Sequence, residues 1–204
     1  HPVAHSFPTR RSSDLGQKKR AALAGILAMQ PEILLLDEPT ANLDPRQEEV
    51  LLDLLKQFDG TLMCVSHDLI FLDHLCQRAV VLDQGRIHHD YAMQDLVSQP
   101  QSLREHGLDS SFRLAVPPSQ SESEAPASTP SREKQMPVSD TKDTLPLVRM
   151  DNYAYRYSDG TQALQGIHLF VQSGERVAMV GENGAGKTTL LACLIGLQQG
   201  DGDY

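Results

Sequence analysis

The stretch that decides the fold reads Gly181-Glu182-Asn183-Gly184-Ala185-Gly186-Lys187-Thr188. It fits the pattern GxxxxGK(S/T), follows the apolar run 176–180 and precedes the helix-favouring run 189–195. Glycines let backbone N–H groups converge on phosphates without side-chain collisions, and a helix start adds partial positive charge. We therefore predict a strand, a phosphate-binding loop and a helix. Lys187 would reach the β- and γ-phosphates of a nucleotide, and Thr188 would bind Mg²⁺. We also expect Thr189 to contact the nucleotide.

A second group of polar residues follows an apolar run near the start of the chain. Residues 33–36 are continuously apolar, as in a buried parallel strand, and Asp37 and Glu38 come directly after them. Asp37 suits Mg²⁺ binding, either directly or through a water, and Glu38 suits polarising an attacking water. An acidic turn after a strand is common, so this pair alone is a weak signal.

Helix-favouring and strand-favouring runs alternate through the first half of the chain. The predicted helices there are 17–29, 45–58 and 69–76, and the predicted strands are 33–36, 61–65 and 79–82. Asp44 is the expected N-cap of the second helix. In the second half, strands are predicted at 148–157, 167–171 and 176–180, with a helix from about Lys187. This alternation predicts an α/β fold, a parallel sheet with helical crossovers.

The two halves are separated by a stretch that cannot build a core. Residues 115–146 contain six Pro, six Ser and no aromatic residue, so we expect a disordered linker. We expect residues 16–114 and 147–204 to be two units on either side of it, and the family resemblance given below implies that they are the C-terminal part of a first ATPase domain and the N-terminal part of a second. Residues 5–15 resemble the translation of a common sequencing adapter, and we expect residues 1–15 to be non-native.

Composition narrows the classes of partner. The 18 basic and 27 acidic residues give a formal net charge of −9, which disfavours a broad electrostatic contact with nucleic acid or anionic lipid. Cys64, Cys76 and Cys193 lack the close pairing that a zinc site or a disulfide framework would need, and we interpret them as reduced thiols. The longest apolar runs are far below the roughly 20 residues that cross a bilayer.

Two further motifs make the interpretation specific. Residues 41–44 read Ala-Asn-Leu-Asp, and residues 65–68 read Val-Ser-His-Asp after another predicted strand. In this order, with the phosphate loop and the acidic pair, they resemble the D-loop and switch-histidine motifs of ABC-type ATPases. The resemblance covers nearly all of the chain except residues 1–15 and the linker. It implies that His67 hydrogen-bonds the γ-phosphate and the attacking water, that Asp44 lies in a loop contacting a paired domain, and that Tyr157 stacks on adenine.

The signature motif of that family, LSGGQ, is damaged. The aligned residues 13–17 read Ser-Asp-Leu-Gly-Gln, so only Gly16 and Gln17 match, and Asp14 replaces the serine that would meet a γ-phosphate. An acid there repels phosphate, so this signature should work poorly as written. Because ABC domains pair head to tail, the resemblance implies that the phosphate loop and Gly16-Gln17 belong to one composite site. Asp37, Glu38 and His67 would belong to the other, and neither site would be complete.

The patterns at residues 39–45, 75–86, 105–108 and 155–164 resemble the ATPases of energy-coupling-factor and cobalt/nickel-type importers. This implies a subunit that binds and hydrolyses ATP with Mg²⁺, lies peripherally at the cytoplasmic face of the cell membrane and drives separate integral membrane subunits to import a metal ion or vitamin. The fragment would be inactive alone, and we expect no nucleic-acid partner. The alternatives are a cytosolic tandem ABC protein acting on the ribosome, which usually carries Asn-His-Leu-Asp at positions 41–44, and a nonfunctional fragment. The transported substrate is not encoded in this chain.

Overall fold

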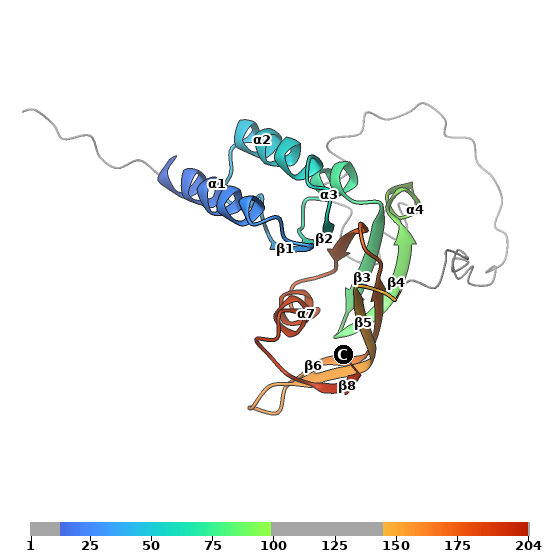
Figure 1. Ribbon diagram of the computed structural model, residues 1–204. Helices are drawn as coiled ribbons and strands as arrows, with labels where there is room; N and C mark the ends of the chain where they lie inside the picture. Colours follow the sequence, from blue (N-terminus) through green and yellow to red (C-terminus); the bar gives the residue numbers. More distant parts are fainter. Residues whose placement is uncertain (1–12, 99–144, 204) are drawn as a thin grey trace, which may run out of the picture.

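The computed structural model describes residues 13–98 and 145–203 (Figure 1). Its helices are α1 (Ser13–Ala28), α2 (Pro45–Lys56), α3 (Leu69–Leu75), α4 (Met93–Ser98) and α7 (Lys187–Leu194). Its strands are β1 (Ile33–Asp37), β2 (Thr61–Val65), β3 (Arg78–Asp83), β4 (Arg86–Ala92), β5 (Val148–Arg156), β6 (Gln162–Val171), β7 (Arg176–Val180) and β8 (Asp201–Asp203). The expectations for residues 1–12, 105–108 and 115–144 lie outside the described residues.

Local sequence explains how α2 begins. The Oδ1 atom of Asp44 accepts a hydrogen bond from the Gln47 backbone N–H at 2.9 Å, and the Gln47 side chain accepts one from the Asp44 N–H at 3.4 Å. This reciprocal capping box, with Pro45 at the first helical position, satisfies N–H groups that the helix cannot pair internally. The predicted N-cap is confirmed, and the helix buries Leu51 and Leu55.

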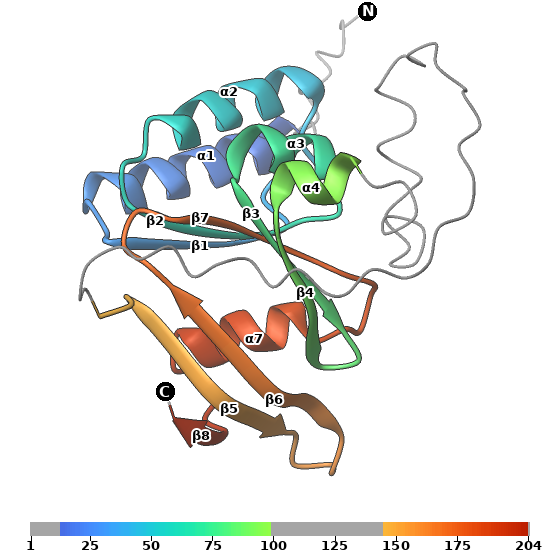
Figure 2. The same ribbon diagram turned by 90° about the vertical axis from the view of Figure 1, so that its right-hand side faces the viewer.

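The main sheet has five strands in the order β1-β2-β7-β3-β4. The first four run parallel, and β4 pairs antiparallel with β3. Helices α1 to α4 cover one face of this sheet, while α7 and the antiparallel sheet β6-β5-β8 lie on the other side (Figure 2). The predicted α/β class with a parallel-rich sheet is therefore present.

Alternation along β7 feeds two hydrophobic cores. Ala178 and Val180 face the core that the sheet forms with α2 and α3, whereas Val177 and Met179 face the core shared with β5, β6 and α7. All four side chains are fully buried. A strand that is apolar on both faces needs a layer on each side, and this sequence supplies both.

One strand of the later segment lies within the sheet of the earlier segment. Strand β7 belongs to the segment 145–203, yet it lies between β2 and β3 of the segment 13–98. The register pairs Met63 with Val177 on one side and Ala79 with Ala178 on the other. The parallel strands of the sheet therefore come from both segments. Burial of the apolar surface of β7 between β2 and β3 favours this single sheet.

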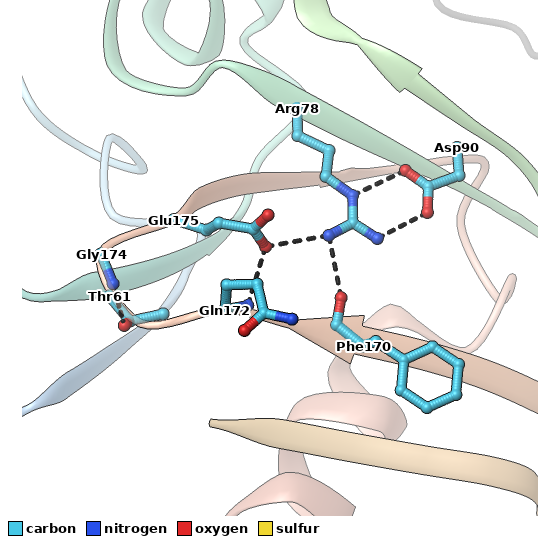
Figure 3. Close-up of polar contacts among 7 residues, drawn as sticks. All are labelled: Thr61, Arg78, Asp90, Phe170, Gln172, Gly174 and Glu175. Atoms are coloured by element: carbon cyan, nitrogen blue, oxygen red, sulfur yellow. Dashed lines mark hydrogen bonds and ion pairs between the residues drawn. The ribbon is translucent and has the colours of Figure 1, made fainter. Parts of the chain in front are cut away.

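A polar cluster ties the two segments together at the amino-terminal end of β7 (Figure 3). The Arg78 guanidinium donates to both carboxylate oxygens of Asp90 at 2.7 and 2.6 Å, to Oε2 of Glu175 at 2.9 Å and to the Phe170 carbonyl at 2.9 Å. Nearby, the Gly174 N–H donates to Oγ1 of Thr61 at 2.9 Å. Arg78 thus joins β3 and β4 to the turn between β6 and β7, and we call Arg78, Asp90 and Glu175 the arginine clamp.

Several elements were not predicted from sequence. Strand β4 and helix α4 follow the Gln84-Gly85 turn, and the short β8 pairs with β5. Strand β1 was expected to be buried, but within the described residues it pairs with β2 alone and is half-buried at the sheet edge. Across residues 13–98 and 145–203, no helix combines the length and apolar character needed to cross a membrane.

Candidate functional site

The phosphate loop joins β7 to α7. Gly186 is the N-cap of α7 with φ 103°, and no side chain caps this end, which leaves its backbone N–H groups facing the loop. Lys187 Nζ donates to the carbonyls of Gly181 at 2.7 Å and Glu182 at 2.8 Å. Burial lowers the pKa of Lys187, while the nearby carboxylates of Glu38 and Asp37 act in the opposite direction. The loop therefore holds the buried Lys187 cation beside the uncapped N-terminus of α7.

Two glycines of this loop have no room for a side chain. A Cβ added at Gly181 would lie 2.1 Å from the Leu82 carbonyl oxygen, and one added at Gly186 would lie 2.9 Å from the Ala163 carbonyl oxygen. Both glycines also have positive φ values, 144° and 103°. The glycine spacing of the motif is thus set by close backbone contacts with β3 and β6 as well as by access for a ligand.

The acidic residues lie where β1 ends. Asp37 pairs in register with Val65 of β2, so the residues that follow the two strands meet at one edge of the sheet. His67 Nε2 lies 3.3 Å from Glu38 Oε1, and the Ser66 hydroxyl lies 3.5 Å from Glu38 Oε2. Glu38 has φ 45°, a backbone strain found more often at functional sites than elsewhere.

Asp68 fixes the orientation of the loop that carries His67. Its Oδ1 accepts from the N–H groups of Ile70 at 3.1 Å and Phe71 at 3.0 Å, which caps α3. Its own N–H donates to the Ser66 hydroxyl at 3.1 Å. The histidine therefore sits between a strand end and a capped helix, and its imidazole is held against Glu38.

A cavity of about 400 Å³ unites these parts. It is lined by Asp37, Glu38, Val65, His67, Tyr157, Thr161, Gln162, Ala163, Asn183, Gly184, Gly186, Lys187, Thr188 and Thr189. The family resemblance implies that the acidic residues and the phosphate loop belong to different composite sites, and in the structure both line this one cavity. The reason is topological, because β1, β2 and β7 run parallel and end at the same edge.

The predicted binding residues divide into those that line the cavity and those that do not. Gly16 and Gln17 fall within α1, and their surroundings lie outside what the structure describes. Gly181, Glu182 and Ala185 belong to the phosphate loop, and other residues of that loop line the cavity. Thr161, Gln162 and Ala163, at and just before the start of β6, also line the cavity and were not predicted from the sequence. Their signal was the Ser158-Asp159-Gly160 turn, which folds them back beside Tyr157.

Tyr157 stands at the mouth of the cavity. Its hydroxyl is 2.8 Å from Oγ1 of Thr189, and its ring meets that of Tyr155 edge to face at 5.0 Å. The side chain of Gln162 donates to the carbonyls of Tyr155 and Leu164, which fixes the hairpin carrying both rings. Tyr157 remains 37% exposed and lines the cavity, so part of its side chain is open to solvent there.

The donor set fits Mg²⁺ bound together with a nucleotide. Asp37 and Thr188 supply a carboxylate and a hydroxyl oxygen to the same cavity. Among the described residues, no group of three or more His, Cys, Asp or Glu side chains could hold a metal by itself. Mg²⁺ commonly takes one or two protein oxygens and completes its shell with water and phosphate, which agrees with this sparse set.

A second cavity, of about 420 Å³, lies beneath the carboxyl ends of α1 and α2. Its wall includes Leu27, Pro31, Leu54 and Phe58, and Asp59 is its single ionisable lining residue. It lacks the convergent polar groups of the first cavity, so the first one is the candidate site.

The chain is similar in sequence to known proteins of one family. Residues 164–204 match the family model described as ABC transporter. The matches support the ABC transporter ATP-binding protein family for this chain. A protein of Methanosarcina acetivorans named as an ABC transporter ATP-binding protein is 35% identical over 89% of this chain and 35% of its own length.

Two further relatives carry the same description. The protein from Treponema denticola is 32% identical over 93% of this chain and 37% of its own length. The protein from Streptomyces coelicolor is 44% identical over 48% of this chain and 37% of its own length. The chain thus spans about a third of the length of the curated relatives it matches.

Proposed function

We propose that this chain is part of an ATP-binding and ATP-hydrolysing subunit that powers an ABC-type importer of a metal ion or vitamin. The observation that carries the proposal is the cavity in which the phosphate loop faces Asp37, Glu38 and His67. A phosphate-binding backbone cradle and a carboxylate–imidazole pair are the two parts that nucleotide hydrolysis needs.

The segment 145–203 binds the nucleotide. The N–H groups of the loop and the N-terminus of α7 receive the phosphates, and Lys187 neutralises their charge from within the loop. Thr188 and Asp37 would hold Mg²⁺, which would neutralise phosphate charge there. Tyr157 offers its ring to adenine.

The segment 13–98 supplies the water-activating groups. Glu38 accepts a proton from the attacking water as the water oxygen bonds to the γ-phosphorus, the bond from that phosphorus to the bridging oxygen breaks, and ADP leaves. His67, whose Nε2 lies 3.3 Å from Glu38 Oε1, orients that water and the γ-phosphate. Holding these side chains at adjacent strand ends fixes their spacing before the substrate arrives.

We further propose that the chain is a piece of a longer tandem protein. Residues 16–114 correspond to the end of a first ATPase domain, 115–146 to a linker, and 147–204 to the start of a second. Two relatives align with 89% and 93% of this chain yet extend far beyond it, which supports this arrangement. In this chain, the single sheet is then formed by parts of two related domains. In the longer protein, the two domains pair head to tail.

The finer assignment is an energy-coupling-factor or cobalt/nickel-type importer, peripheral at the cytoplasmic face of the cell membrane. It is supported by the sequence patterns at residues 39–45 and 155–164. The full-length parent purified from membranes should carry integral membrane subunits with it. Recovery with ribosomes instead would replace this assignment. Sequencing the source DNA across residues 1–15 tests whether that segment is native.

The binding step is tested by titrating the 204-residue chain with MgATP in a calorimeter. Lys187→Ala should weaken binding by about 100-fold or more, because a buried cation that faces the phosphates is lost. Lys56→Ala, which removes a charge on α2 away from the cavity, is the matched control and should leave the Kd unchanged. Equal affinities in all three proteins would refute the proposal. Phosphate release should be negligible, because Asp14 damages the signature, and turnover abolished by Glu38→Gln would contradict that expectation.

A further inference from the structure

The turn between β3 and β4 has an unusual backbone. Gln84 and Gly85 form its two central residues, with φ values of 45° and 76°, and Asp83 pairs with Arg86 across it. Positive φ at both central positions defines the tight hairpin turn that matches strand twist. We call Gln84 and Gly85 the hairpin tip.

Both backbone groups of Gly85 bond outside the hairpin. Its N–H donates to the Ala185 carbonyl of the phosphate loop at 3.0 Å, and its carbonyl accepts from the Gln165 N–H of β6 at 2.7 Å. Next to it, the Arg86 guanidinium donates to the Gln165 side-chain oxygen at 3.0 Å. The hairpin tip is therefore wedged between the loop that binds phosphates and the strand behind it.

This contact tolerates no side chain. A Cβ added at Gly85 would lie 2.4 Å from the Ala163 carbonyl oxygen, and a Cβ added at Gly186 would lie 3.6 Å from the Gly85 Cα. Only a glycine combines the positive φ with this approach. Packing of the hairpin tip and the conformation of the loop are thus linked through backbone atoms.

We propose that the hairpin tip positions the phosphate loop for its ligand. A trans peptide unit points its C=O and its N–H in opposite directions. Holding the Ala185 carbonyl outward against Gly85 therefore turns the Gly186 N–H the other way, and Gly186 lines the cavity. Gly85 belongs to the segment 13–98. It is a positioning residue that directs the Gly186 N–H of the segment 145–203 toward the phosphates. The inference rests on the proposed nucleotide site.

The test compares two glycine variants of the full chain. Gly85→Ala strains φ and displaces the hairpin tip. Gly174→Ala is the matched control, since its φ is 80° and, among the described residues, no heavy atom lies within 4 Å of the added Cβ. Gly85→Ala should weaken MgADP binding by about tenfold or more and should shift the ³¹P resonance of the bound β-phosphate. Gly174→Ala should bind within about twofold of the unmodified chain with an unshifted resonance.

If Gly85→Ala does not fold, Arg86→Ala and Gln165→Ala decide, because they loosen the same hairpin tip through an exposed side-chain contact. Each should weaken MgADP binding by about two- to threefold and shift the same resonance. Unchanged binding and resonance in the variants that fold would overturn the positioning role while leaving the nucleotide site intact. Failure of the unmodified chain to bind MgADP would overturn both proposals.

Discussion

The segments 13–98 and 145–203 build opposite sides of one cavity by different means. The later segment contributes backbone: glycines at positive φ, carbonyls around Lys187 and an uncapped helix start. The earlier segment contributes side chains, and Glu38 and His67 meet because β1 and β2 are neighbours. The phosphate loop is encoded in one continuous stretch of sequence, whereas the contact between Glu38 and His67 depends on strand order. The two kinds of site therefore differ in how far sequence alone can describe them.

The largest expected effect tests whether the two segments behave as one folding unit. Met179 on β7 is fully buried in the core shared by strands of both segments. Met179→Ala should lower the free energy of unfolding by about 2–5 kcal/mol, because it removes buried apolar volume and leaves a cavity. Urea unfolding followed by circular dichroism gives this value, and unfolding should remain a single transition.

The control for that measurement is Leu197→Ala. Leu197 is 75% exposed, so its truncation should change the free energy of unfolding by less than about 0.5 kcal/mol. Two separate unfolding transitions in the unmodified chain, with Met179→Ala affecting only one, would contradict a shared core.

A smaller effect measures the arginine clamp. The Arg78 side chain is 23% exposed and bonds two carboxylates and a carbonyl from different elements. Arg78→Met should cost about 1–2 kcal/mol of unfolding free energy, because three charge-assisted contacts are lost and two acids remain close together. Arg149→Met removes a looser pair with Asp151, at 3.7 Å and 58% exposure, and should cost less than about 0.5 kcal/mol.

Salt separates the two arginines further. About 0.5 M NaCl should reduce the effect of Arg149→Met toward zero and leave most of the effect of Arg78→Met, because partly buried pairs are screened less. Equal costs for both variants would mean that the clamp adds nothing beyond an ordinary surface pair.

Sequence patterns predicted most elements because their signals are local. The strand at residues 61–65 and the Asp44 cap appear as expected, since an apolar run and a capping residue act over a few neighbours. Strand β4 was missed because Arg86–Ala92 is mostly polar, with Ile87 and Tyr91 as its large apolar residues, and pairing with β3 makes it a strand. Burial of β1 was overestimated because an apolar run does not reveal which strands will lie beside it, and β1 lies at the edge of the sheet.

The candidate site likewise has one part that the sequence predicts and one part that it does not. The phosphate loop follows directly from its motif, and its residues surround the N-terminus of α7. Its union with Glu38 and His67 required knowledge that β7 lies between β2 and β3, which motif order cannot supply. The role of Gly85 was also hidden, since it depends on a contact between residues a hundred positions apart.

The smallest effect separates the two sides of the cavity within binding itself. Glu38 lies close enough to Lys187 to act on its pKa, and its carboxylate faces the position proposed for the phosphates. Glu38→Gln removes one negative charge, which should tighten MgATP binding by about threefold, the size of one charge pair acting over several ångströms in a hydrated site. Glu49→Gln removes an exposed acid on α2 and should leave the Kd unchanged. Because Lys187→Ala should strongly weaken binding while Glu38→Gln should improve it, a calorimetric titration of both variants would assign the affinity to the later segment. Weaker binding by Glu38→Gln would instead mean that the carboxylate helps to hold the nucleotide. The affinity would then not come from the later segment alone.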